Sequence, residues 1–156
     1  MRITLLTVGK TTDPRLASLI EDYRQRLTHY VPFEWVVLPD LKNAKALSEE
    51  QVKTAEGEMI LRALTPSMDV VLLDEHGKEM RSVEYADWIQ KKMSSGRDLT
   101  LIIGGPYGFS PAVYERANGK LSISQMTFSH QMIRIMVIEQ IYRAMTILRG
   151  EPYHHE

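Results

Sequence analysis

The stretch Leu101-Ile-Ile-Gly-Gly-Pro-Tyr-Gly-Phe-Ser110 is the most informative part of the sequence, because an apolar run ends there abruptly in a glycine-rich turn. Ser110-Pro111 then signals a helix start, since serine caps helices and proline is accepted in their first turn. The glycines lack the Cβ atoms that would keep backbone groups away from a ligand. The segment matches neither the dinucleotide motif G-x-G-x-x-G nor the P-loop. It predicts a strand end that binds another cofactor, with a tight ligand-free connection as the alternative.

A second strand end supports the ligand interpretation. Residues 120–124 form another apolar run, followed by Gln125-Met-Thr-Phe-Ser129 and a long helical pattern. The carboxyl ends of parallel strands meet at one edge of a sheet, where such folds bind ligands. We therefore expect the loops after these two strands to face each other.

Strand and helix patterns alternate along the whole chain. Strands are expected at residues 2–8, 33–38, 69–74, 99–103 and 120–124. Helices are expected after the caps Asp13, Ser48 and Ser82, and over residues 111–116 and 129–149. This alternation predicts one α/β domain over residues 1–156, with a parallel-rich sheet in a three-layer arrangement.

Composition narrows the possible classes of protein. The chain is 44% apolar and 25% charged, as in an ordinary globular protein, and its net charge of −1 argues against binding nucleic acid by bulk electrostatics. It has no cysteine, which excludes disulfides, thiolate zinc sites and cysteine nucleophiles. We find no signal peptide and no apolar run of about 18 residues, so we expect a cytoplasmic protein without a membrane segment.

The last helix is apolar almost all round in its first half. Its residues include Met132, Ile133, Ile135, Met136, Val137 and Ile138. One amphipathic face against a sheet does not explain this pattern, so the helix is expected to be buried on two sides. The second side is expected to be another copy of the chain, in a homodimer. A central helix within a single core is the alternative.

Four segments together carry a family resemblance: residues 101–108, 121–130, 134–144 and 149–154. They resemble the SPOUT superfamily of knotted methyltransferases, and the likeness extends over essentially the whole chain, including residues 3–10 and 73–78. The resemblance is strongest to small single-domain members that methylate N3 of a pseudouridine in large-subunit ribosomal RNA. It implies a C-terminal trefoil knot, an obligate homodimer, S-adenosylmethionine as cofactor and no metal.

The resemblance also assigns cofactor contacts and a substrate. The cofactor contacts would be Leu73, Gly104, Gly105, Ile123, Ser124, Gln125, Met126, Thr127 and Phe128. Because the chain is nearly neutral and shows no separate RNA-binding domain, assembled ribosomes are expected as substrate rather than free RNA. The alternatives are a knotted methyltransferase acting on transfer RNA and a nonenzymatic RNA-binding α/β dimer.

Three residues are candidates for binding the base that accepts the methyl group or for catalysing its methylation. His154 is a candidate general base, because a short tail after the last helix can fold over the cofactor; a frayed terminus is the alternative. Tyr153 is expected to stack on or hydrogen-bond the flipped base, or else simply to pack. The resemblance places Arg143 at the substrate, whereas its spacing from Glu139 also allows a structural ion pair.

The roles of three further residues stay open. His130 and Arg134 share a face at the start of the last helix, where either is able to hold an RNA phosphate or the cofactor carboxylate. His130 is equally suited to be a buried structural histidine, and His155 to be only solvated. The spacing of the histidines supports no metal site.

Overall fold

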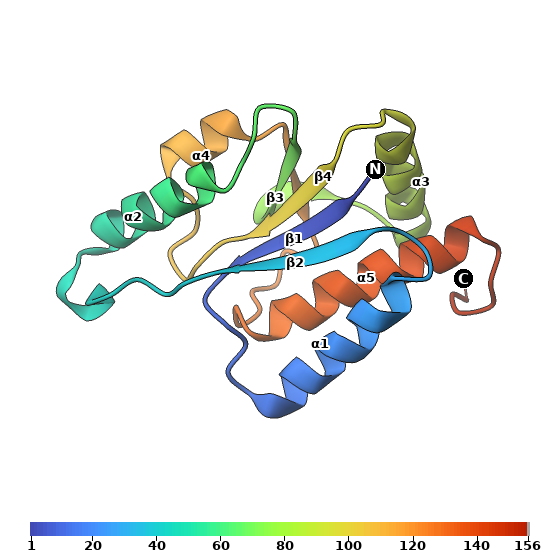
Figure 1. Cartoon of the computed structure of the whole chain (residues 1–156), viewed down its shortest axis with the longest axis horizontal. Helices are drawn as coiled ribbons and strands as arrows, with labels where there is room; N and C mark the ends of the chain where they lie inside the picture. Colours follow the sequence, from blue (N-terminus) through green and yellow to red (C-terminus); the bar gives the residue numbers. More distant parts are fainter. Residues whose placement is uncertain (156) are drawn as a thin grey trace.

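Five parallel strands form one sheet in the computed structural model, which describes residues 1–155 (Figure 1). The strand order across the sheet is β2-β1-β4-β3-β5. The strands are β1 (Ile3–Val8), β2 (Phe33–Leu38), β3 (Asp69–Glu79), β4 (Leu99–Ile103) and β5 (Gly119–Ser122). Every neighbouring pair runs parallel, so all carboxyl ends lie at one edge. This confirms the predicted α/β class and parallel sheet.

The helices begin close to their predicted caps. They are α1 (Pro14–Leu27), α2 (Glu49–Arg62), α3 (Ser82–Ser94), α4 (Pro111–Arg116) and α5 (Met132–Leu148), with a short 3₁₀ helix η1 (Ala44–Ala46). Asp13, Ser48 and Ser110 each accept a hydrogen bond from a backbone N–H in the first turn of α1, α2 and α4. Ser82 is instead the first residue of α3. Within residues 1–155, no helix is long and apolar enough to cross a membrane.

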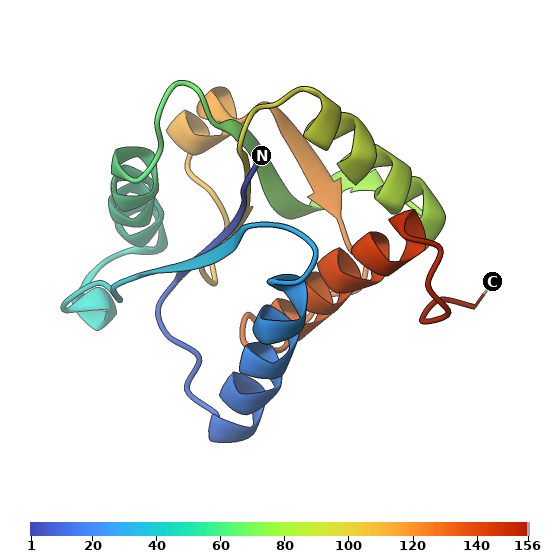
Figure 2. The same ribbon diagram turned by 45° about the vertical axis from the view of Figure 1, so that its right-hand side comes forward.

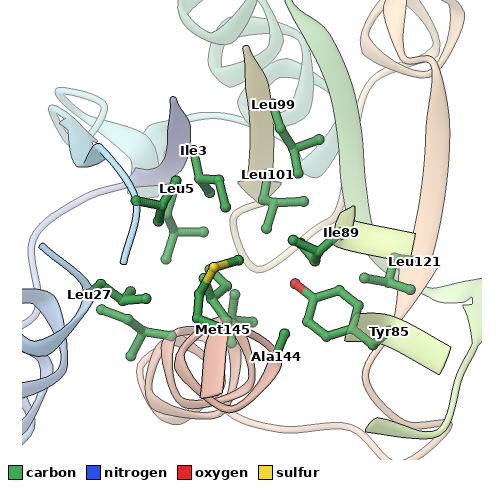
Figure 3. Packing of buried hydrophobic residues seen from close by; sticks show 14 of the residues in the cluster. Ile3, Leu5, Leu27, Tyr85, Ile89, Leu99, Leu101, Leu121, Ala144 and Met145 are labelled. Carbon is green, nitrogen blue, oxygen red and sulfur yellow. The ribbon is translucent and has the colours of Figure 1, made fainter. Parts of the chain in front are cut away.

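Different helices cover the two faces of the sheet, which gives the predicted three layers (Figures 1 and 2). On one face, α1, α3 and α5 enclose a core whose labelled side chains in Figure 3 are Ile3, Leu5, Leu27, Tyr85, Ile89, Leu99, Leu101, Leu121, Ala144 and Met145. On the other face, α2 and α4 cover a second core that contains Leu6, Leu72 and Ile102. Because both faces are buried, the central strands are apolar at successive positions.

Strand β3 is longer than the sequence predicts. It continues to Glu79, and its pairing with β5 is irregular between Leu73 and Lys78, both of which are opposite Leu121. A Cβ atom on Gly77 would lie only 2.6 Å from the Leu121 backbone nitrogen, so this close approach requires glycine. The polar stretch around Gly77 is typical of a loop, and this is why the sequence prediction ended the strand at residue 74.

Helix α5 buries most of its apolar surface inside its own chain. Ile135, Val137 and Ile138 are buried, and the helix contacts both α1 and α3. Met132 is 40% exposed and Met136 is half-buried. The alternative of a central helix within one core therefore accounts for much of the apolar pattern, and the side that carries Met132 and Met136 is left for any partner. The helix also begins at Met132, later than predicted.

Candidate active site

A cavity of about 790 Å³ opens at the carboxyl edge of the sheet, between the irregular part of β3 and the loops that follow β4 and β5. Its volume is typical of a small-molecule site. The lining residues are Glu49, Lys53, Leu73, Asp74, Glu75, His76, Ile103, Gly104, Gly105, Pro106, Tyr107, Gly108, Phe109, Tyr114, Ser122, Ile123, Ser124, Met126, Thr127, Phe128, Ser129, His130 and Ile133. The two strand ends singled out in the sequence therefore face one another, as predicted.

The glycine-rich segment forms a tight turn on the wall of this cavity. The Gly108 N–H donates to the Gly105 carbonyl at 3.2 Å, and Gly108 has a φ of 82°, which favours glycine. A Cβ on Gly104 would lie 3.0 Å from the Phe109 ring, and one on Gly105 would lie 2.4 Å from Glu56 Oε1. At Gly104 and Gly105 the missing side chains thus make room for protein neighbours, whereas a Cβ atom on Gly108 would meet nothing within 4 Å.

The loop after β5 supplies the other wall and presents apolar side chains to solvent. Met126 is 76% exposed and Phe128 is 37% exposed, both on the cavity lining. Gln125 does not line this cavity, and its amide lies 3.5 Å from Glu79 Oε2 in a neighbouring open hollow. The structure therefore brings together all the predicted cofactor contacts except Gln125.

Asp74 holds a negative charge at the cavity edge. Its carboxylate accepts hydrogen bonds from the Tyr114 hydroxyl and from the His76 backbone N–H, the latter at 2.9 Å. Burial raises the pKa of Asp74, but these hydrogen bonds outweigh burial and the pKa lies below its ordinary value. Burial and the Asp74 hydrogen bond raise the pKa of Tyr114 to about 12, so Tyr114 stays a donor. A cationic ligand group would be stabilised here.

Arg143, Tyr153 and His154 lie together in a second cluster around Glu139. Glu139 Oε1 accepts hydrogen bonds from Arg143 Nη2 at 2.6 Å and from the Tyr153 hydroxyl at 3.0 Å. The Arg143 guanidinium also lies 4.8 Å from the centre of the Tyr153 ring. Burial and hydrogen bonds to Tyr23 and Glu139 raise the pKa of Tyr153 above its ordinary value, so Tyr153 is a donor and not a base.

The His154 ring is held by Arg143. Arg143 Nη1 lies 3.1 Å from His154 Nδ1. A guanidinium only donates, so Nδ1 must accept, and the neutral ring then carries its hydrogen on Nε2. That Nε2 atom is enclosed and has no hydrogen-bond partner among residues 1–155. In this arrangement Nδ1 is occupied by Arg143 and becomes available as an acceptor only when Arg143 moves away.

The tail that carries these residues is fixed to α1 and to the segment that follows it. The Tyr30 hydroxyl donates to Glu151 Oε2 at 2.5 Å, and the hydroxyls of Tyr23 and Tyr153 are 3.2 Å apart. The Tyr142 ring lies edge-on to the Tyr153 ring, with centroids 4.8 Å apart. These contacts stabilise a defined tail conformation, in contrast to the frayed terminus considered from the sequence.

The loop that leads into α5 and the C-terminal tail lie at opposite ends of this helix (Figures 1 and 2). Ile133 lines the cavity from the first turn of the helix, whereas none of Arg143, Tyr153 and His154 lines it. At 1.5 Å per residue, Ile133 and Arg143 are about 15 Å apart along the helix axis. Within one chain the tail therefore does not fold over the cavity, contrary to the sequence expectation.

Arg134 has a structural environment. It is 2% exposed, and its guanidinium donates to the Val8 carbonyl at 2.9 Å, to Thr11 Oγ1 and to the His130 carbonyl. These hydrogen bonds connect the end of β1 and the loop after it to the start of α5, so Arg134 is not available to an RNA phosphate. His130 lines the cavity, which leaves it near the ligand.

Comparison with known proteins identifies the family. A family described as "Predicted SPOUT methyltransferase" matches residues 1–154. The chain belongs to the SPOUT methyltransferase family. It is 57% identical to "Ribosomal RNA large subunit methyltransferase H" of Phocaeicola vulgatus and of Bacteroides fragilis, and 55% identical to the protein of that name from Porphyromonas gingivalis. Each alignment covers 100% of both chains.

SPOUT methyltransferases use S-adenosylmethionine, and the cavity residues fit this cofactor. The exposed apolar side chains of Met126 and Phe128 provide a surface for an adenine ring, next to Leu73 and Ile123 on the lining. The ionised Asp74 suits a ligand that carries a sulfonium and an ammonium group. Apolar and anionic groups are thus present in the combination that the cofactor requires.

Several lining residues were not among the predicted contacts. Asp74 was detectable, because it follows the buried part of β3 and must lie at the same edge as Leu73. Tyr114 reaches the cavity only because the cap of α4, Ser110, lies beside the turn, and Lys53 reaches it from α2, on the same face of the sheet as α4. Such approaches between elements leave no local signal in a sequence.

Proposed function

We propose that this protein methylates N3 of a pseudouridine in large-subunit ribosomal RNA, with assembled ribosomes as its substrate. The observation that carries the proposal is the full-length similarity to proteins named for large-subunit ribosomal RNA methylation, combined with a cavity built from the expected loops. These names favour ribosomal over transfer RNA. The intact cavity favours an enzyme over a nonenzymatic dimer. A net charge of −1 favours recognition of a shaped particle over capture of free RNA.

We infer that residues 1–156 form one SPOUT domain and that its C-terminal part is threaded as the trefoil knot of the family. The turn 104–108 and the loop 123–129, which line the cavity together, are the segments we assign to cofactor binding in the knot. Leu73, Ile123, Met126 and Phe128 would contact the adenine, and backbone groups of the two loops would bind its polar edge. We assign to Gln125, which does not line the cavity, the role of stabilising the conformation of the loop 123–129. Because its proposed substrate is the ribosome, the protein is expected in the cytoplasm.

We further propose that the functional unit is a homodimer whose active site combines two copies. The cavity lies at the first turn of α5, whereas Glu139 and Arg143 hold the tail cluster in the second half of the helix, so one chain does not bring the two together. A twofold axis across α5 would place the tail end of one copy beside the cavity end of the other. The partly exposed Met132 and Met136 provide the apolar side for this contact.

The chemistry follows from the groups that such a site would contain. S-adenosylmethionine, when bound, supplies an electrophilic methyl group for in-line transfer. Arg143 binds a carbonyl or phosphate of the acceptor, and in doing so it releases Nδ1 of His154. Nδ1 then accepts the N3 proton of the base, and Tyr153 donates a hydrogen bond or stacks on the ring. Positioning of the acceptor in this way contributes much of the rate enhancement over the uncatalysed reaction.

Mass spectrometry of ribosomal RNA from cells that lack the protein tests this function. We expect one pseudouridine in the large-subunit RNA to lose its N3 methyl group and wild-type protein to restore it. Protein truncated before Tyr153 should not restore it, although it still binds cofactor. An unchanged ribosomal RNA with a missing methyl group in transfer RNA would favour the alternative substrate.

A further inference from the structure

Helix α2 carries a glutamate, Glu56, whose carboxylate is enclosed behind the turn 104–108. Glu56 is 6% exposed, and its Oε1 has no hydrogen-bond partner among residues 1–155. Burial, together with the negative charge of Asp40, raises the pKa of Glu56. An enclosed polar atom without a partner is unfavourable, so the position of this side chain calls for a physical explanation.

The carboxylate is in direct contact with the turn. A Cβ atom on Gly105 would lie 2.4 Å from Oε1 and 2.5 Å from Oε2 of Glu56, so the two groups leave no space for a methyl group between them. Gly105 lines the cavity and Glu56 does not. Glu56 and the cavity therefore lie on opposite sides of the same turn.

The next residue of α2 makes a similar contact further along the loop. A Cβ atom on Gly57 would lie 2.4 Å from Oγ of Ser110, the residue that caps α4. Helix α2 is thus packed closely against the segment from Gly105 to Ser110 at two successive positions. A change in the position of α2 would be transmitted to the cavity wall.

We propose that Glu56 is a positioning residue for the cofactor, because through its contact with Gly105 it fixes the depth of the turn 104–108. The inference rests on the assignment of this cavity to S-adenosylmethionine. With the carboxylate in place, the turn is unable to move toward α2, and the distance between Gly105 and the opposite wall of Leu73 and Ile123 is set. Removal of the carboxylate lets the turn sink toward α2 and widens the cavity.

A double-mutant cycle with S-adenosylmethionine binding, measured by calorimetry, tests this contact. Gly105→Ala should weaken binding about tenfold, since the new methyl group displaces the turn from Glu56. Glu56→Ala should also weaken binding, whereas the isosteric Glu56→Gln should bind like wild type. The double variant Glu56→Ala/Gly105→Ala should bind more tightly than Gly105→Ala, because the methyl group then occupies the vacated space. Each variant's thermal unfolding is recorded alongside.

Glu58 provides a matched control, because it is an exposed glutamate on the same helix. Glu58→Ala should bind normally and should not rescue Gly105→Ala. Hydrogen exchange of the amides in residues 104–108 gives a second readout, which we expect to be faster in Glu56→Ala than in Glu58→Ala. Independent losses at Glu56 and Gly105 without rescue, or unchanged exchange, would overturn the proposal. Absence of binding by the wild-type protein would instead refute the cofactor assignment.

Discussion

Two carboxylates in this protein, Asp13 and Asp74, are held ionised by hydrogen-bond donors. Asp13 caps α1 and accepts from the Arg15 backbone N–H at 2.8 Å and from Arg15 Nη2 at 2.8 Å. The Arg15 side-chain and backbone hydrogen bonds lower the pKa of Asp13 to about 2. Asp74 has the same type of environment at the cavity. At both positions the charge contributes to local structure.

Acid should weaken the fold through Asp13. Its pKa of about 2 lies below the ordinary value of 3.8. Its contribution to stability is therefore present above about pH 4 and disappears as the pH falls through about 2. Asp13→Asn keeps a side-chain oxygen for the cap but does not titrate. We expect the urea midpoint to fall less between pH 5 and pH 2 in this variant than in wild type. Equal falls would show that the charge of Asp13 is not linked to folding.

The sequence predicted which residues surround the cavity better than it predicted what each one does. Leu73, Ile123 and Phe128 lie on the lining as expected, because strand ends in a parallel sheet meet at one edge. Because Gly105 has no side chain, Glu56 packs directly against it, although the two residues are far apart in the sequence. Only the packing of α2 against the turn reveals that contact.

At the level of elements, the tail is organised by α1. Tyr30 of the segment after α1 binds Glu151, and Arg149 lies 4.3 Å from the centre of the Tyr30 ring. Tyr23 binds Tyr153. The sequence showed the tail as a functional segment by resemblance alone, since a terminal Tyr-His has no helix or strand pattern. Its partner on α1 depended on how α1 and α5 pack.

Tyr30→Phe should separate tail placement from cofactor binding. The change removes the hydroxyl that binds Glu151 and keeps the ring against Arg149, at a cost of about 1–2 kcal/mol in unfolding free energy. We expect the kcat of methyl transfer to fall about tenfold, because Tyr153 and His154 lose a fixed position. Cofactor affinity, measured by calorimetry, should not change. A loss of cofactor affinity equal to the loss of kcat would contradict a role limited to the tail.

For the whole molecule, the element order and the sheet class were predictable, because the three central strands contain apolar runs and the helices between them have caps or periodic patterns. The knot was expected from the resemblance alone, since no local pattern encodes chain threading. The separation of cavity and tail was not foreseen, because it depends on the length and direction of α5. That separation is the structural reason to expect a composite site.

The dimer proposal is tested on the exposed side of α5. Ile138 is fully buried in its own chain, so a charge there would unfold the protomer and give no information on assembly. Met132→Glu/Met136→Glu places charges on the side left for a partner and should convert a dimer into a folded monomer by light scattering. Leu47→Glu, at an exposed apolar position before α2, is the control and should stay dimeric. A monomeric wild-type protein at micromolar concentration would refute the proposal.

Methyl transfer by mixed dimers shows whether one active site combines residues from two copies of the chain. One variant ends at Pro152 and lacks the tail, and the other carries Gly105→Val, verified by calorimetry not to bind cofactor. Each alone should be inactive in tritiated-methyl transfer to ribosomes. After mixing and exchange, about a quarter of wild-type activity should appear, because half of the dimers then contain one complete site. Nucleoside mapping should place the label on N3 of a large-subunit pseudouridine. Continued inactivity of the mixture beside active wild type would contradict the composite site, and label found elsewhere would contradict the proposed function.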